Sequence, residues 1–232
     1  MHRATLAIVL TAAGILAAAA ASASQPAGGA TKNQQSGPSP ALLAEGAAIA
    51  REGIKPSVAA CESCHGTGGG AFPLLSAQPE EYITRQLADF RNGKRNSPMM
   101  SQIAKAMTEQ QMNAVAAHYS RQAHRKAGGG RSEAEVLQRG GELALIGDAK
   151  LGVTGCDTCH GTDGQGGDFP ALAGQNPAYI AAQIKAFRDG TRTNDSSGLM
   201  QAVAKALQDA DAKAVGAYYR DVRELVKEVV EE

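Results

Sequence analysis

The chain has 232 residues, a length that fits one large domain or two small ones. Lysine and arginine together number 23, and so do aspartate and glutamate, so the formal net charge is zero and argues against a nucleic-acid partner. Aromatic residues make up only 4% of the chain and tryptophan is absent, so a core built from side chains alone would be thin.

The N-terminus carries the pattern of an export signal. A basic start, His2 and Arg3, precedes an apolar run over residues 4–21, and Ala21-Ser22-Ala23 matches the small-x-small cleavage pattern. We predict a signal peptide over residues 1–23 and a periplasmic mature protein. The alternative is an uncleaved signal that anchors the protein to the inner membrane, since about 18 apolar residues just span a bilayer. Peripheral membrane association therefore stays open.

Residues 24–40 are rich in Gln, Gly, Ser and Pro. This composition buries too little apolar surface to fold, so we predict a disordered lead-in.

The most informative feature of the chain is a short motif that occurs twice. The two copies are Cys61-Glu62-Ser63-Cys64-His65 and Cys156-Asp157-Thr158-Cys159-His160. Cys-x-x-Cys-His is the attachment signature of c-type haem. Residues three apart share one face of a helical turn, so both thiols of a copy can reach the two vinyl groups of one porphyrin. The histidine that follows can then bind the iron.

Two other interpretations of the motif are a zinc half-site and a thioredoxin-like redox pair. Zinc needs four ligands, and each motif by itself offers only three, two cysteines and one histidine. The four cysteines could pool into one zinc site, but the histidine after each pair would then be unexplained. We therefore predict two covalently bound haem c groups and no structural disulfide. The haems are attached at Cys61, Cys64, Cys156 and Cys159, with His65 and His160 as iron ligands.

The rest of the chain repeats in the same way. Residues 82–93 (YITRQLADFRNG) align position for position with residues 179–190 (YIAAQIKAFRDG), which indicates a duplicated unit. We predict a first domain over residues 41–126, a glycine-rich linker over 127–131 and a second domain over 132–232. Apolar residues recur at helical spacing and no strand pattern stands out, so the predicted fold class is all-α.

Two helix starts can be predicted from capping residues. Thr108 and Gln111 have the spacing of a capping box at the start of the last helix of the first domain. Asp209 is the predicted cap of the matching helix in the second domain.

The second iron ligand is predicted from the repeat. Met100 and Met200 occupy matching places after their histidines, and Met/His pairs are typical of electron-carrying cytochromes. Met99, Met107 and Met112 align with residues other than methionine, so we interpret these three as core-filling side chains.

Residues 41–225 resemble the cytochrome c4 family, di-haem cytochromes built from tandem class I cytochrome c domains. The shared motifs are Cys-x-x-Cys-His-Gly, Phe-Pro, Leu-x-x-Gln, Phe-Arg-x-Gly and the distal Met, in this order and twice. The resemblance implies two domains packed face to face, each wrapped around one haem, with the haem propionates near the interface. It also implies that the carbonyls of Pro73 and Pro170 accept hydrogen bonds from the haem-binding histidines.

Arg91 and Arg188 are candidates for binding the propionates. The alternative, a solvated arginine at a helix end, is equally consistent with the sequence.

The expected function is electron transfer without catalysis. If a histidine and a methionine cap each iron, no open position is left for a substrate. We expect a carrier that takes single electrons from a quinol-oxidising complex or another donor and passes them to a terminal oxidase. The alternative is an electron-transfer subunit of a periplasmic dehydrogenase or a flavocytochrome.

Overall fold

The structure, a computed structural model, describes residues 37–66 and 72–231, and for residues 226–231 it describes the backbone alone. The predicted signal peptide and most of the lead-in lie outside the described residues. The first half contains α1 (Pro40–Glu52), α2 (Glu62–His65), α3 (Glu80–Arg91), α4 (Pro98–Lys105) and α5 (Glu109–Ser120). The second half contains α6 (Ala134–Leu145), α7 (Asp157–His160), the 3-10 turn η1 (Thr162–Gly164), α8 (Pro177–Arg188), α9 (Leu199–Ala206) and α10 (Asp209–Glu231).

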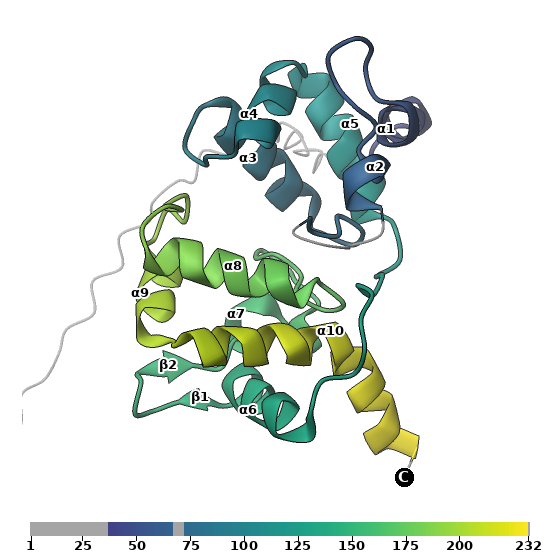
Figure 1. Cartoon of the computed structure of the whole chain (residues 1–232). Coiled ribbons are helices and arrows are strands. Elements are labelled where there is room, and N and C mark those ends of the chain that lie inside the picture. Colours follow the sequence, from purple (N-terminus) through teal and green to yellow (C-terminus); the bar gives the residue numbers. More distant parts are fainter. Residues whose placement is uncertain (1–36, 67–71, 232) are drawn as a thin grey trace, which may run out of the picture. The chain divides into compact units, whose positions relative to one another are not determined.

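The predicted all-α class is confirmed, with one small addition. Strands β1 (Gly147–Asp148) and β2 (Val153–Thr154) pair antiparallel and close the loop before the second Cys motif (Figure 1). In the described part of the first half, a bridge between Ile54 and Val58 lies at the corresponding place. Strands of two residues are too short to show the alternation by which a strand is predicted. None of the helices in residues 37–66 and 72–231 is long and apolar enough to cross a membrane.

The first and last helices of each half cross at a glycine. Helix α1 packs on α5, and α6 packs on α10. A Cβ atom at Gly46 would lie 2.0 Å from the carbonyl oxygen of Ala114, and one at Gly140 would lie 2.2 Å from that of Ala214. Any larger side chain would push the two helices apart, which explains why a glycine occurs at this point of both repeats.

Each half has a hydrophobic core of its own. The first core includes Ile49, Leu87, Met107, Met112 and Tyr119. The second includes Leu143, Ile184, Phe187, Val215 and Tyr219.

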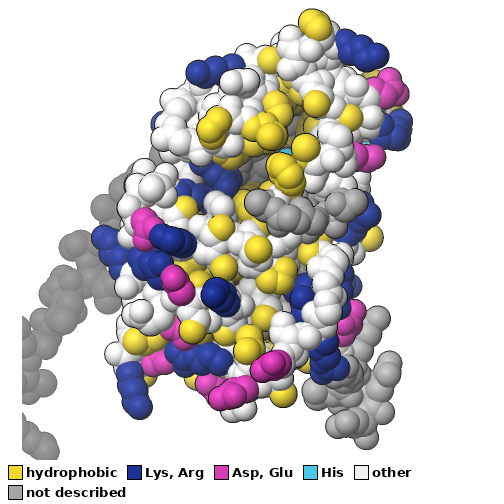
Figure 2. All heavy atoms as spheres, in the orientation of Figure 1, with side chains coloured by type: hydrophobic (Ala, Val, Ile, Leu, Met, Phe, Trp, Pro, Cys, Tyr) yellow, Lys and Arg dark blue, Asp and Glu magenta, His cyan; other side chains and the backbone are white. Residues whose placement is uncertain are grey.

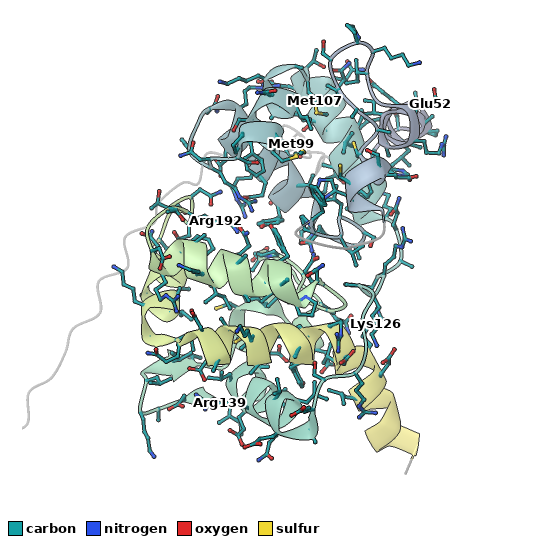
Figure 3. The ribbon with its side chains drawn as sticks, viewed as in Figure 1. Glu52, Met99, Met107, Lys126, Arg139 and Arg192 are labelled. Atoms are coloured by element: carbon teal, nitrogen blue, oxygen red, sulfur yellow. The ribbon has the colours of Figure 1, made fainter. Side chains whose placement is uncertain are left out.

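The structure separates the three methionines that the sequence analysis treated alike. Met107 and Met112 are buried in the first core, as predicted. Met99 is 51% exposed, so its interpretation as a core residue was wrong (Figure 3). Met99 lies in the first turn of α4, and it is not among the buried residues of that helix.

One of the two predicted caps is confirmed. The Thr108 hydroxyl accepts from the backbone N–H of Gln111, and the Gln111 side chain accepts from the N–H of Thr108. Asp209 does not cap α10, because the helix begins at Asp209 itself. Its carboxylate instead accepts a hydrogen bond from Arg188 at 2.6 Å, and the backbone N–H of Gln208 is bonded to Asp211.

The segment between the two halves is attached to the second half. Ala127, the first residue of the predicted linker, is buried, and its N–H donates to the carbonyl of Gly174 at 2.7 Å. The preceding Lys126 forms ion pairs with Asp221 and Glu224 of α10. The start of this segment is therefore held in place by both backbone and side-chain contacts.

A difference between the two repeats allows a test of a buried hydrogen bond. Tyr219 donates to the Asp157 carboxylate at 2.6 Å, whereas the matching Tyr119 hydroxyl is buried without a partner among the described residues. Hydrogen bonds to charged groups contribute about 1.5–3 kcal/mol. We expect Tyr219→Phe to lower the free energy of unfolding by roughly 1.5 kcal/mol, because Asp157 is partly accessible to water. Tyr119→Phe is the matched control and should cost nothing in denaturant unfolding. Equal losses in both variants would contradict the assignment.

Candidate functional site

One cavity connects the two halves. It has a volume of about 2240 Å³, larger than the roughly 300–1,000 Å³ of a pocket for a single small ligand. Both Cys-x-x-Cys-His motifs and both candidate methionines line it. Figure 2 shows hydrophobic side chains gathered around a hollow in the upper part of the molecule. Its size and its apolar lining suit two large, flat, mostly apolar groups.

The two motif histidines have the same hydrogen bond. His65 Nδ1 lies 2.8 Å from the carbonyl oxygen of Pro73, and His160 Nδ1 lies 2.8 Å from that of Pro170. A carbonyl only accepts, so Nδ1 carries the proton and Nε2 is the nitrogen left to bind a metal. Burial lowers the pKa of both histidines, although the bond to the proline carbonyl acts in the opposite direction. Both rings are therefore held neutral, the form that binds iron.

Cys64 and Cys159 lie in the single helical turns α2 and α7. Cys61 and Cys156 directly precede these turns, and their backbone already has helical dihedral angles, as the motif spacing predicts. Cys61 and Cys156 pack against the two cores, and burial raises the pKa of each thiol to about 11. Such thiols are protonated at neutral pH.

The structure bears on the alternative sites considered for these cysteines. All four are free thiols, so neither pair forms a disulfide. Within the described residues, no three His, Cys, Asp or Glu side chains are grouped so as to hold a metal ion. The described cysteines and histidines are therefore not grouped as a pooled zinc site would need.

Met100 and Met200 occupy equivalent positions in the first turns of α4 and α9. The Ser97 hydroxyl starts α4 by accepting from the N–H of Met100 at 3.2 Å. Both methionines are half-buried and pack against the core of their own half while lining the cavity. The structure thus brings each methionine to the same cavity as its histidine. Their ligation of iron stays a prediction.

The arginines considered for the propionates are bonded elsewhere. Arg91 donates from Nε to the carbonyl of Ala104 at 3.3 Å, and Arg188 donates to the carbonyl of Leu207 at 3.2 Å. Arg188 also pairs with Asp209. Arg91 also donates to the carbonyl of Met107 at 2.5 Å. Both arginines therefore connect the helix that carries them to the loop before the last helix of the domain, which is a structural role.

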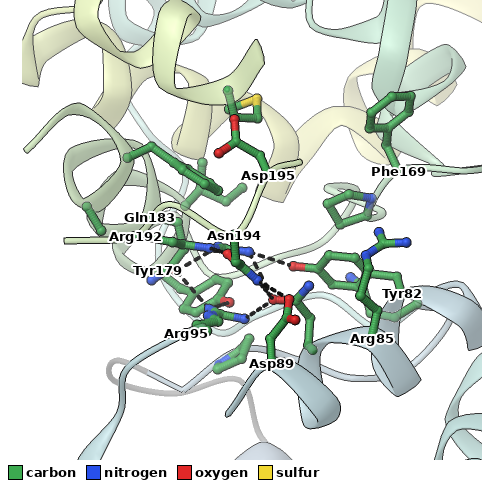
Figure 4. A pocket seen from close by; sticks show the side chains of 18 of the residues that line it. Tyr82, Arg85, Asp89, Arg95, Phe169, Tyr179, Gln183, Arg192, Asn194 and Asp195 are labelled. Carbon is green, nitrogen blue, oxygen red and sulfur yellow. Dashed lines mark hydrogen bonds between the residues drawn. The ribbon is translucent and has the colours of Figure 1, made fainter. Parts of the chain in front are cut away.

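A polar cluster that the sequence analysis missed lies at the domain boundary (Figure 4). We call it the interdomain arginine cluster. It consists of Tyr82, Gln86, Arg95, Tyr179, Gln183 and Arg192, three matching residues from each repeat.

The hydrogen bonds of this cluster cross the boundary in both directions. Arg95 donates to Tyr179 at 2.9 Å and to Gln183 at 2.8 Å. Arg192 donates to Tyr82 at 3.3 Å and to Gln86 at 3.2 Å. Each guanidinium also lies over a phenylalanine ring of its own domain. The signals in the sequence were the matching tyrosine and glutamine within residues 82–93 and 179–190 and the matching arginine two residues after the glycine that ends each segment.

The cluster has an excess of positive charge. Arg95 and Arg192 are each only 9% exposed. Among the described residues, their side chains donate to the amide oxygens of glutamine and asparagine and to tyrosine hydroxyls, all of which are neutral. The nearby carboxylate of Asp89 accepts from Asn194 rather than from an arginine. Burial raises the pKa of Tyr82, but the positive charges of Arg192, Arg95 and Arg85 outweigh it and lower the pKa overall. Buried cations need anionic partners, so this part of the cavity suits carboxylate groups.

Comparisons with known proteins agree with this geometry. The cytochrome c family model matches residues 147–223, and the model for cytochrome C oxidase, cbb3-type, subunit III matches residues 42–118. A cytochrome c4 from Pseudomonas aeruginosa is 33% identical over 184 residues, which are 76% of this chain and 90% of the relative. The chain belongs to the cytochrome c4 family. Like the carriers of that family it is an electron-transfer protein and not an enzyme.

Two further similarities concern thiosulfate oxidation. A thiosulfate dehydrogenase electron acceptor from Thiomonas intermedia is 41% identical over 167 residues, 69% of this chain and 77% of the relative. The solved structure of thiosulfate dehydrogenase TsdBA from Marichromatium purpuratum, in its "as isolated" form, superposes with a TM-score of 0.69 at 32% identity. That match covers 77% of this chain but only 40% of the dehydrogenase chain.

Family membership and the residues present agree on the cofactor. As a di-haem cytochrome c, the protein carries two covalent haem c groups. Each half supplies two thiols on one turn, a neutral histidine with Nε2 available and a half-buried methionine, and the shared cavity is mostly apolar. The buried arginines at the boundary suit the haem propionates.

The methionine assignment can be tested by single substitutions in the holoprotein. We expect Met100→Ala and Met200→Ala each to remove one of two Met–iron charge-transfer bands and to lower one reduction potential, because a methionine ligand raises the potential. Optical spectroscopy and redox titration measure both effects. Met99→Ala is the control, since this neighbour is exposed and should leave both bands intact. Loss of a band in that variant would shift the assignment by one residue.

The positive charge of the interdomain arginine cluster should raise the potentials of the protein. Reduction adds an electron, which a nearby cation stabilises, so Arg192→Gln should lower the mean reduction potential by tens of millivolts, on the order expected for one poorly screened charge. Arg51→Gln removes the same charge from an exposed position on α1 and serves as the control. Equal shifts in the two variants would show that the location of Arg192 at the boundary has no special effect.

Proposed function

We propose that this protein is the electron acceptor of a periplasmic thiosulfate dehydrogenase. In this role it is the electron-transfer subunit or partner of a dehydrogenase, the second of the two functions considered from the sequence. The observation that carries the proposal is that the motif histidine and the candidate methionine of each half line the same cavity. Such a protein takes up and releases electrons but has no open iron position for thiosulfate itself.

The number of haems supports this assignment. Oxidative joining of two thiosulfate ions to tetrathionate releases two electrons, and each haem takes up one. A protein with two haems therefore stores the electrons of one complete turnover. The dehydrogenase carries out the bond formation between the sulfur atoms, and this chain supplies only the sites at which the electrons arrive.

The similarity to relatives supports the same partner. A protein named as a thiosulfate dehydrogenase electron acceptor is 41% identical to this chain. In the Marichromatium purpuratum dehydrogenase, a region similar to this chain is part of the same polypeptide as the rest of the enzyme. An electron acceptor of this type works close to its donor, and direct contact between the two is the simplest way to achieve that.

The second candidate function is a general carrier between a quinol-oxidising complex and a terminal oxidase. It is favoured by the 33% identity to a cytochrome c4. The two functions share the same haems and differ in the donor. The periplasm is the compartment we propose for both, after removal of residues 1–23, or with these residues retained as an anchor.

Reconstitution with candidate donors distinguishes the two. We expect the oxidised holoprotein to be reduced by a thiosulfate dehydrogenase and thiosulfate at least tenfold faster than by a quinol-oxidising complex and quinol. Stopped-flow absorbance at the haem bands measures both rates, and thiosulfate without the dehydrogenase is the control. Faster reduction by the quinol-oxidising complex would favour the general carrier. Reduction by thiosulfate alone would contradict both functions.

A further inference from the structure

Two buried glutamines hold the domains together by reciprocal hydrogen bonds. Gln175 accepts from the backbone N–H of Leu74 at 2.8 Å and donates to its carbonyl at 2.9 Å. Gln78 accepts from the N–H of Ala171 at 3.1 Å and donates to its carbonyl at 2.7 Å. Gln78 is 7% exposed and Gln175 is 4% exposed, and the two occupy matching places in the repeat. We call these four residues the glutamine clamp.

The clamp glutamines bind the segments whose proline carbonyls orient the histidines. Leu74 directly follows Pro73, whose carbonyl accepts from His65, and Ala171 directly follows Pro170, whose carbonyl accepts from His160. Each glutamine is thus connected through one peptide unit to the histidine of the other domain. Gln78 of the first domain leads to His160, and Gln175 of the second leads to His65.

The clamped segments are positioned in part by these bonds, and in the second domain the N–H of Leu172 also donates to the carbonyl of Gly164 at 2.7 Å. Residues 72–75 and 170–172 belong to no helix or strand, so no regular backbone ladder holds them. A buried amide that accepts from the N–H and donates to the carbonyl of one residue fixes the two peptide units on either side of that residue, and leaving it unpaired is costly. Loss of a clamp glutamine would therefore release the neighbouring proline carbonyl and weaken its bond to the histidine.

We propose that Gln78 and Gln175 are positioning residues for the iron-binding histidine of the opposite domain. In this arrangement each domain tunes the haem of its neighbour through backbone hydrogen bonds. The proposal rests on the two covalent haems and not on the identity of the electron donor. It holds whether thiosulfate dehydrogenase or another protein reduces the chain.

The sign of the effect follows from the histidine bond. A hydrogen bond from Nδ1–H to a carbonyl makes the imidazole a stronger donor to the metal, which favours the oxidised iron. Weakening that bond favours the reduced iron and raises the reduction potential. A change in Gln78 should therefore appear at the haem attached to Cys156 and Cys159, on the other side of the boundary.

Leucine substitutions in the full-length holoprotein test the proposal, because leucine roughly preserves the volume of glutamine without its hydrogen bonds. The two potentials are measured by redox titration followed by NMR, with the axial His and Met signals assigning each potential to its haem. We expect Gln78→Leu to change the reduction equilibrium of the second-domain haem at least threefold, about 28 mV at 59 mV per tenfold, with a smaller change in the first. Gln175→Leu should give the mirror image.

Two controls separate this role from simple loss of contact between the domains. Lys126→Gln removes another contact across the boundary, the ion pairs with Asp221 and Glu224 outside the haem cavity, and should leave the ring-proton signals of both histidines unchanged. If a leucine variant fails to fold, Gln78→Asn keeps the amide and shortens its reach, and should shift the same haem by less. A larger shift in the substituted domain's own haem, equal shifts in both, or no shift in either would overturn the proposal.

Discussion

The hydrogen bond from each motif histidine to a proline carbonyl is the interaction on which the rest of the structure depends. Nδ1 lies 2.8 Å from the carbonyl oxygen in both domains. The bond sets the tautomer of His65 and His160 and leaves Nε2 of each ring available to a metal. The carbonyls of Pro73 and Pro170 lie on segments without regular secondary structure, so their positions come from tertiary contacts. Those contacts reach into the other domain. The site that binds one haem is therefore completed by the domain that binds the other.

The domain boundary serves a second purpose through its charges. Arg95 and Arg192 are buried beside the cavity, and their hydrogen bonds run to the neutral side chains of the opposite domain. An uncompensated guanidinium is costly away from water, and haem propionates are the anions that the cofactors bring. Binding of the haems and packing of the two domains therefore stabilise each other. This explains how a chain with few aromatic residues forms two small domains with a large shared cavity.

The repeat made most of the site predictable. Duplication of Cys-x-x-Cys-His identified the attachment points and histidines, and the aligned positions singled out Met100 and Met200 among the methionines. The errors concern features of one or two residues. Met99 is exposed at the cavity instead of buried in the core, Asp209 begins the helix instead of capping it, and a hairpin of two two-residue strands closes one loop. Such details depend on which neighbour a side chain contacts. The Asp209 carboxylate, for example, accepts a hydrogen bond from Arg188, which lies 21 positions earlier in the chain.

The sequence by itself determined the chemistry, because covalent haem attachment needs only two thiols and a histidine on one helical turn. It also determined the helical class and the duplication, which follow from local spacing. Only the tertiary structure decided which arginines are buried. Arg91 and Arg188 bind backbone carbonyls, while Arg95 and Arg192 reach across the boundary. It also decided that Gln78 and Gln175 bind the loops of opposite domains. The physical reason is that these bonds join residues about 100 positions apart, and no local pattern specifies such partners.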